Sequence, residues 1–269
     1  MEIVGKNGAE RWNKIPQLTL LFWIMKITAT TLGETGGDLL AQTLNVGYAI
    51  STLIFFAFFL VMVISQLSVK RYVPAIYWAV IVATSTAGTT MSDFMDRTLA
   101  LGYAVGTAIL VSILIVILII WRLTEKSLSV TNIQSFRGEA FYWTAILFSN
   151  TLGTALGDFL ADSSGLGFGG SALLITGVLV LIVLAYYFTS ISRVVLFWIA
   201  FVLTRPFGAT FGDLLTKSKE KGGLAYGTLG ASIILFALLV GLIIYETVKL
   251  RKPRVEMRSR RRWDTVTAE

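Results

Sequence analysis

Four aspartates of the 269-residue chain occupy one position of an internal repeat. Each follows a tryptophan by fifteen residues, and a glycine lies ten residues after the same tryptophan. Only seven aspartates occur in the chain, so chance is a poor explanation for four in one register. Carboxylates inside a membrane are costly and typically mark ion or proton pathways. The register predicts a cation site built from Asp38, Asp93, Asp158 and Asp213, which follow Trp23, Trp78, Trp143 and Trp198.

Hydroxyl groups and one glutamate precede these aspartates on the same helix face. Residues three and four apart share a face of an α-helix, and positions eight, eleven and twelve after each tryptophan meet that condition. Oxygen atoms at these positions would line a path that leads to the aspartates. The predicted lining residues are Glu34, Thr31, Thr35, Thr89, Thr90, Thr154 and Thr210.

The residue types narrow the identity of the cation. Oxygen ligands suit Mg²⁺, Ca²⁺ and Mn²⁺, and also Na⁺ or H⁺. The chain has no histidine and no cysteine, which disfavours Zn²⁺ and Cu⁺ and excludes disulfides and Ser/His or Cys/His catalytic pairs. Met91 and Met95 flank Asp93, and a thioether contact would favour Mn²⁺, although methionines on apolar helices more often pack. We therefore expect the four aspartates to be metal ligands, with Mn²⁺ favoured.

Two basic residues break the repeat inside apolar segments. Lys26 and Arg205 occur in the first and last repeats, where the middle repeats carry uncharged residues. A buried cation needs a carboxylate or a water-filled cavity, so the expected partner is Glu34 or an aspartate of a neighbouring repeat. Lys26 could instead snorkel to the interface. Paired with the acids, the two bases would replace a missing cation and couple occupancy to alternating access. Pro206 is expected to interrupt the helix that carries Arg205.

The elements that must position these residues are membrane helices. Hydrophobic residues make up 55% of the chain, charged residues make up 14%, and the mean hydropathy is +0.74. A spanning helix needs about 20 mostly apolar residues, and the apolar runs here are continuous, whereas the strands of a barrel alternate. Eight spans are predicted, at 18–40, 47–69, 74–95, 99–121, 141–160, 168–188, 194–215 and 224–247.

The spans group into four repeats of two helices each. Because every repeat has an even number of spans, all four point the same way and can be related by an axis along the membrane normal. The expected fold is an all-α integral membrane protein with eight transmembrane helices. We expect four helical hairpins in two four-helix halves, with pseudo-fourfold or nested twofold symmetry. The predicted boundaries are 1–17 for the N-terminal segment, 18–72, 73–128, 138–192 and 193–248 for the repeats of the 18–248 membrane domain, and 249–269 for a basic tail.

The net charge of +7 comes largely from that tail, which holds eight of the 23 basic residues. A basic cluster beside a membrane favours anionic lipid as its partner, not nucleic acid. Seventeen basic residues lie in the N-terminal segment, the even-numbered loops and the tail, against four in the opposite loops, which places both termini in the cytoplasm. No cleavable signal peptide is expected. The tail residues are Lys249, Arg251, Lys252, Arg254, Arg258, Arg260, Arg261 and Arg262.

The tracts GETGGDLL, GTALGDFL and GATFGDLL resemble a family of bacterial multi-pass proteins described as membrane-anchored. The resemblance covers residues 18–247 and implies a protein of the bacterial inner membrane, but it brings no activity with it. The Gly-Asp tracts also resemble faintly the GxGD tract of intramembrane aspartyl proteases. Those enzymes need a Tyr-Asp partner, which this chain lacks, so no enzymatic activity is expected.

The sequence therefore predicts a transmembrane cation transporter, with a divalent metal as the transported ligand and no resident cofactor. One alternative is a scaffold or sensor whose basic tail binds lipid or a partner, and another is a proton- or sodium-coupled carrier of a small solute. A purely structural interpretation also fits the pattern, since small residues commonly pack membrane helices together and each aspartate could simply end its helix at the interface. The sequence leaves the oligomeric state open.

Overall fold

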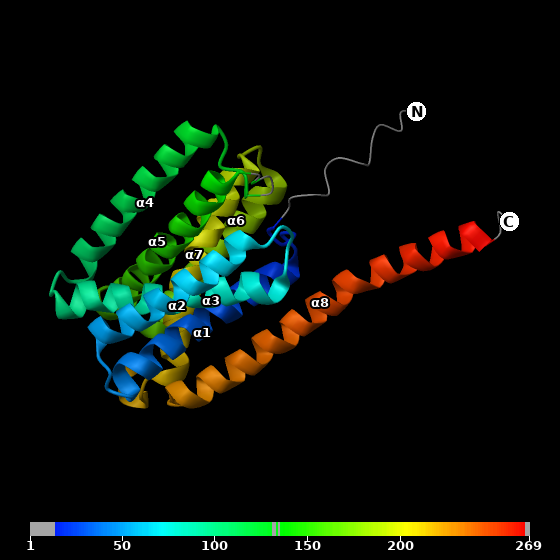
Figure 1. Cartoon of the computed structure of the whole chain (residues 1–269). Coiled ribbons are helices and arrows are strands. Elements are labelled where there is room, and N and C mark those ends of the chain that lie inside the picture. The colour runs from blue at the N-terminus through cyan, green and yellow to red at the C-terminus, as the bar shows by residue number, and fades with distance from the viewer. Residues whose placement is uncertain (1–13, 131–132, 134, 267–269) are drawn as a thin grey trace.

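The computed structural model describes residues 14–130, 133 and 135–266, and the described residues form eight α-helices and no strand (Figure 1). Lys6 and Arg11, which contribute to the predicted orientation, lie outside this part of the chain, as do the side chains after Leu250. The helices are α1 (Leu20–Asp38), α2 (Tyr48–Ser68), α3 (Pro74–Asp93), α4 (Tyr103–Glu125), α5 (Phe136–Asp158), α6 (Gly167–Phe188), α7 (Arg193–Thr216) and α8 (Thr228–Val266).

Local sequence signals set the helix ends. Ser135 caps α5, because its Oγ accepts a hydrogen bond from the Gly138 amide at 2.8 Å, and α5 therefore begins before the predicted position. In contrast, α4 begins after the predicted position. Ala100 and Gly102 have φ angles of 55° and 73°, which are incompatible with a right-handed helix. Figure 1 shows α8 continuing as one helix away from the other seven, through the basic tail to Val266.

In the part of the chain that the structure describes, five helices are long and apolar enough to cross a membrane, which indicates a membrane protein. They are α2, α4, α6, α7 and the part of α8 from Thr228 to Leu250. The other three, α1, α3 and α5, carry many buried threonines, serines and acids that lower their hydropathy. These polar side chains are buried against other helices of the bundle, where such groups are tolerated in membrane proteins.

The four odd-numbered helices form a closed ring. Helix α1 packs on α3, α3 on α5, α5 on α7, and α7 on α1. Each even-numbered helix covers the ring helix of the following repeat: α2 lies on α3, α4 on α5, α6 on α7, and α8 on α1. The two helices of one repeat therefore make few contacts with each other. The two helices of each predicted hairpin follow one another along the chain, but the second helix crosses over to pack on the ring helix of the next repeat.

The repeated glycine lets neighbouring ring helices touch. A Cβ atom added at any of the four positions would come within 2.2 to 2.9 Å of an atom on the next ring helix, closer than real Cβ contacts. Helices in membranes commonly approach each other closely through such small residues. The same contact recurs around the ring, with Gly33 against Ser85, Gly88 against Asn150, Gly153 against Arg205, and Gly208 against Thr30.

The chain after the aspartate differs between the repeats. In the first three repeats a five-residue π-helical segment follows directly, at Leu39–Thr43, Phe94–Thr98 and Phe159–Ser163. In the fourth repeat α7 continues to Thr216 and a short 3₁₀ helix follows at Lys219–Lys221. Single π-helical turns are uncommon and occur frequently at functional sites. Two of these segments carry side chains that meet the aspartates: Gln42 contacts Asp38, and Arg97 contacts Asp93 and Asp158.

Candidate functional site

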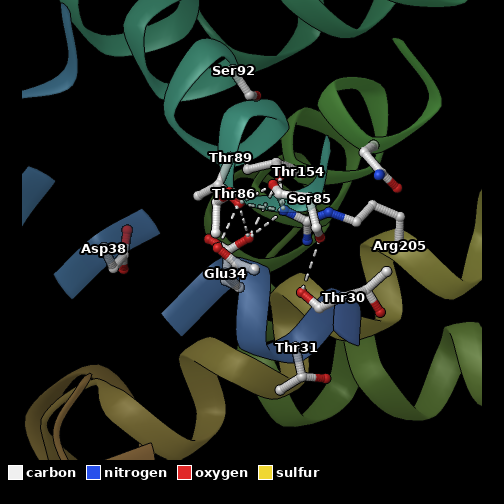
Figure 2. A network of polar contacts seen from close by, with 12 residues as sticks. Thr30, Thr31, Glu34, Asp38, Ser85, Thr86, Thr89, Ser92, Thr154 and Arg205 are labelled. Atoms are coloured by element: carbon white, nitrogen blue, oxygen red, sulfur yellow. Dashed lines mark hydrogen bonds and ion pairs between the residues drawn. The ribbon is translucent and has the colours of Figure 1, made fainter. Parts of the chain in front are cut away.

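The guanidinium group of Arg205 lies at the centre of the ring, where Figure 2 shows it facing Glu34, Thr89 and Thr154. Its Nη2 atom donates to Glu34 Oε2 at 3.0 Å and to Thr154 Oγ1 at 2.7 Å, and it also contacts Thr89 Oγ1. The exposed fraction of each of these residues is 3% or less. Charge-assisted hydrogen bonds of this kind are stronger than neutral ones. Three ring helices thus converge on one side chain of the fourth.

Glu34, Thr89 and Thr154 occupy matched positions, eleven residues after their tryptophans. The fourth residue in this position is Ala209, in the repeat that supplies Arg205. A single layer across the ring therefore consists of one acid, two hydroxyls and one methyl group, with the arginine from the same helix as the alanine in its centre.

Asp38 and Asp213 share one ammonium group at the end of the ring where α1 and α7 terminate. Lys217 Nζ lies 2.5 Å from Asp38 Oδ2 and 3.1 Å from Asp213 Oδ1. Gln42 donates from Nε2 to Asp38 Oδ1 at 2.5 Å. Both aspartates are buried, whereas the Lys217 side chain is 18% exposed. We call Glu34, Asp38, Asp213 and Lys217 the lysine cluster.

Asp93 and Asp158 share a guanidinium group in the same way. Arg97 Nε lies 2.9 Å from Asp93 Oδ1, and its Nη2 lies 3.2 Å from Asp158 Oδ2. The same guanidinium lies 5.9 Å from the ring centroid of Tyr48 and 5.8 Å from that of Tyr103, within the range of cation–π attraction. We call Asp93, Asp158 and Arg97 the arginine cluster.

The four aspartates therefore form two pairs and do not gather into one site with four ligands. Among the described residues, one group of three acids is compact enough to hold a metal ion. Carboxylate oxygens of Glu34, Asp38 and Asp213 all lie within 4.8 Å of one another, and all three residues are buried. Asp93 and Asp158 are not part of this group. The donor set is all oxygen, which suits a hard cation.

Four of the predicted lining threonines turn away from this network. The hydroxyl groups of Thr31, Thr35, Thr90 and Thr210 donate to carbonyl oxygens of their own helices, at 2.9 to 3.3 Å. Thr35 also accepts a hydrogen bond from Ser232 of α8 at 2.9 Å. Back-bonding to the preceding helical turn is the usual way for a buried threonine to satisfy its hydroxyl. Only Thr89 and Thr154 of the predicted lining threonines reach the central arginine in the described part of the chain.

Lys26 departs from both alternatives predicted for it. Its side chain is fully buried, so it does not snorkel to an interface, and its Nζ lies 3.4 Å from the amide oxygen of Asn150 and not beside a carboxylate. The ammonium also lies 4.1 Å from the ring centroid of Phe201. The physical reason is position, since Lys26 lies two turns before Glu34, whose carboxylate is already paired with Arg205.

The predicted interruption at Pro206 is wrong. Helix α7 is continuous from Arg193 to Thr216, although proline removes one backbone hydrogen bond. The proline ring lies against the preceding ring helix, where a Cβ added at Gly153 would come within 3.0 Å of Pro206 Cδ. Close packing on neighbours holds the helix together where one of its own hydrogen bonds is missing.

Sequence reasoning missed the two bases that join the aspartate pairs. Arg97 and Lys217 were counted only as loop charges, yet each follows an aspartate by four residues and so shares its helix face. This position lies nineteen residues after the tryptophan and alternates between repeats, as Gln42, Arg97, Asp162 and Lys217. A base in every second repeat was the signal that could have identified both clusters.

The charge on Lys217 is stabilised by its partners. Burial disfavours the charged amine, but Asp213 and Asp38 outweigh this effect and raise the pKa of Lys217 above its usual value. Lys217 is therefore an ammonium group at neutral pH. It lies just beyond the end of α7, and its side chain is partly exposed, so it acts as a cation that the chain itself supplies to the lysine cluster.

The protein belongs to the class of helical repeat proteins, since four helical repeats surround a buried charged core. Residues 21–72, 76–127, 141–192 and 196–251 each match the family model described as Repeat of Unknown Function (DUF347). These matches cover more than half of the chain, which therefore belongs to this family, and each contains one of the tryptophan–aspartate registers. Comparisons with curated proteins and with solved structures gave no match.

Proposed function

We propose that the protein carries a cation across a membrane and binds it with Glu34, Asp38 and Asp213. The observation that carries this proposal is the approach of three buried carboxylates to within 4.8 Å of one another, beside a lysine that is itself partly exposed. Buried acids inside a membrane are costly, and they are typically retained for ion or proton movement. Lys217 occupies the site as a tethered cation and leaves it when the transported cation enters.

Charge balance favours a divalent cation as the transported ligand. Glu34 is paired with Arg205, so Asp38 and Asp213 contribute two uncompensated negative charges once Lys217 has moved away. One divalent cation would neutralise both. Mg²⁺, Ca²⁺ and Mn²⁺ all accept such oxygen ligands. Met91 and Met95 pack against the apolar core beside Asp93, which lies outside the group of three acids, so the proposed preference for Mn²⁺ has to come from experiment.

The proposal includes eight membrane spans with both termini in the cytoplasm of a bacterium. Helices α1, α3 and α5 are too polar to be recognised by hydropathy, yet the ring and the outer helices enclose them. A carrier is favoured over an open channel, because the Arg205 side chain fills the centre of the ring and is fully buried. Passage then requires that this layer rearrange, as in alternating access.

Uptake of ⁵⁴Mn²⁺ into proteoliposomes, with Mg²⁺, Ca²⁺, Na⁺ and protons as competitors, tests the proposal. Asp213→Asn should abolish uptake in protein that still folds. Asp162→Asn is the matched control, since Asp162 is exposed, near the same end of the bundle, and hydrogen-bonded to Tyr103 at 3.2 Å. Undiminished uptake by Asp213→Asn would refute the proposal, and dependence on protons or sodium alone would favour a carrier of a small solute.

A scaffold or sensor is a second candidate, because α8 continues as one helix beyond its apolar part to Val266. A long basic helix beside a membrane suits binding to anionic lipid or to a partner. Deletion of the residues after Arg251 distinguishes the candidates. A carrier without its tail should retain uptake, whereas a scaffold without it should lose binding to vesicles that contain anionic lipid while showing no uptake before or after the deletion.

A further inference from the structure

A further polar cluster, separate from the three described above, lies at the end of the ring opposite the aspartates. It surrounds a cavity between the end of α2, the beginning of α5 and the residues that precede α1, with Lys14, Gln66, Glu139 and Trp143 in its wall. Gln66, Glu139 and Trp143 are buried, with exposed fractions of 0%, 7% and 2%. The cavity offers about 10 Å³ to the centre of a water molecule, close to the minimum that one water needs.

Four polar atoms of the residues in the cavity wall lack partners within the described part of the chain. They are both amide atoms of Gln66, the Oε1 atom of Glu139 and the indole Nε1 of Trp143. The equivalent indoles of the neighbouring repeats are satisfied, since Trp78 donates to Glu246 at 3.1 Å and Trp198 donates to the Leu128 carbonyl at 3.0 Å. A buried polar group without a partner destabilises the folded protein, so these atoms call for a ligand.

These four atoms define the ligand by their chemistry. Gln66 Nε2 and Trp143 Nε1 are donors, and Gln66 Oε1 and Glu139 Oε1 are acceptors. A cation would leave the two donors facing a positive charge, and an anion would leave the two acceptors facing a negative one. A water molecule donates two hydrogen bonds and accepts two, so it alone of the species that fit this volume can satisfy all four atoms.

The cluster also connects the chain that precedes α1 to the ring. Lys14 Nζ lies 2.6 Å from Glu139 Oε2 and donates to the Leu67 carbonyl at 3.1 Å. The first bond leads to α5 and the second to the end of α2, next to Gln66. The Glu139 carboxylate, which lines the cavity, therefore pairs with Lys14 through one oxygen, and its other oxygen is buried without a partner in the described part of the chain.

We propose that Gln66, Glu139 and Trp143 bind one buried water molecule and that this hydrated cluster fastens the segment at Lys14 over the end of the ring. The water fixes the Glu139 carboxylate from the cavity side, and the carboxylate holds Lys14. The segment thereby closes the end of the ring that lies farthest from the aspartates. This inference does not depend on cation transport.

Two measurements on the full-length protein in detergent test the water-bound latch. A structure at a resolution that reveals ordered water should show one density peak within hydrogen-bond distance of Trp143 Nε1 and Gln66. In hydrogen–deuterium exchange, Gln66→Leu should raise the exchange rate of residues 15–19 by about fivefold, because loss of the water leaves Glu139 less firmly held.

The matched control is Glu125→Gln, which alters a second acid near the same end of α5, where Glu125 Oε2 accepts a hydrogen bond from Ser135 at 2.8 Å. It should leave exchange of residues 15–19 unchanged. An empty cavity in the high-resolution structure would overturn the water site even if Gln66→Leu failed to fold. Unchanged exchange in a folded Gln66→Leu variant would overturn the latch.

Discussion

The lysine cluster and the arginine cluster are built from equivalent positions of the repeat, yet they differ in their number of acids and in their base. In each, a base four residues after one aspartate reaches the aspartate of the following repeat. The lysine cluster adds the carboxylate of Glu34, where the third repeat has the hydroxyl of Thr154. The same framework thus presents three acids to one base in one place and two acids to one base in the other.

The two bases also differ in how firmly they are held. The planar guanidinium of Arg97 forms ion pairs with both aspartates and lies beside two tyrosine rings. An ammonium is a compact point charge on a flexible chain, and it can leave without breaking a fixed fork geometry. The comparison suggests that the arginine cluster locks two ring helices together, whereas the lysine cluster can exchange its base for a cation.

The largest expected difference between the clusters is in transport. Asp213→Asn should reduce cation uptake by about 100-fold or more, because it removes a ligand and a charge that the cation must compensate. Asp158→Asn, in the arginine cluster, should reduce uptake by no more than about threefold, since we propose that the cation binds to the lysine cluster alone. The measurement is initial uptake into proteoliposomes at equal protein content. Equal losses in both variants would show that the two clusters act as one site.

Folding stability in the presence of divalent cations should depend more on the arginine cluster than on the lysine cluster. Arg97→Met leaves two buried carboxylates without a counterion and should cost about 3 kcal/mol, because breaking a buried ion pair costs roughly 3–5 kcal/mol and partial exposure of Arg97 reduces that amount. Divalent cations should not restore its thermal unfolding temperature. Lys217→Met should also lower this temperature, but Mn²⁺, Mg²⁺ or Ca²⁺ should recover most of the loss. Recovery of both variants by the same ion would contradict the proposed division of roles.

Replacement of the lysine by arginine within the lysine cluster should have a smaller effect on uptake. Lys217→Arg keeps the charge but introduces a fork that can bond Asp38 and Asp213 together. Uptake should therefore fall by about tenfold while the thermal unfolding temperature rises. The reciprocal Arg97→Lys variant controls for a general effect of basic substitutions, and it should leave uptake nearly unchanged. Faster uptake by Lys217→Arg would show that departure of the base does not limit transport.

The smallest expected effect is that of pH on the contribution of Lys217. Its pKa is raised in the folded protein, so its stabilisation is complete below the usual lysine value of 10.5 and is lost only as the pH rises through the higher folded value. The difference in unfolding temperature between wild type and Lys217→Met should therefore stay constant between about pH 6 and pH 9. A difference that disappears within this range would mean that Lys217 is neutral in the cluster.

The repeated pattern predicted much of the fold because it depends on matched positions. The tryptophan, glycine and aspartate registers identified four repeats, which the family matches confirm, and the apolar runs indicated the helices. Helix crossover to the next repeat could not be predicted, because an apolar helix face does not specify which neighbour covers it. The ring emerges only from the contacts between helices.

The candidate site could be predicted in part. Glu34, Thr89 and Thr154 could be identified as residues of one helix face. Thr90 and Thr210 lie one position further along their helices and Thr31 lies three positions before Glu34, and all three bond their own helices instead. A threonine hydroxyl has this local alternative wherever a helix places it, so sequence cannot separate the two uses. The division of the aspartates into two pairs depends on Arg97 and Lys217, whose spacing was visible but whose partners on other helices were not.

Thermal unfolding in the presence of cations is the most direct test of the central claim, because a ligand of the folded state raises apparent stability by mass action. Purified wild type and the Asp213→Asn and Asp158→Asn variants should be compared across Mn²⁺, Mg²⁺, Ca²⁺ and Na⁺. A divalent cation at about 100 times its Kd should stabilise wild type and Asp158→Asn by about 2.7 kcal/mol and leave Asp213→Asn unaffected. Stabilisation of Asp213→Asn equal to that of wild type, or no stabilisation of wild type by any divalent cation, would contradict the account.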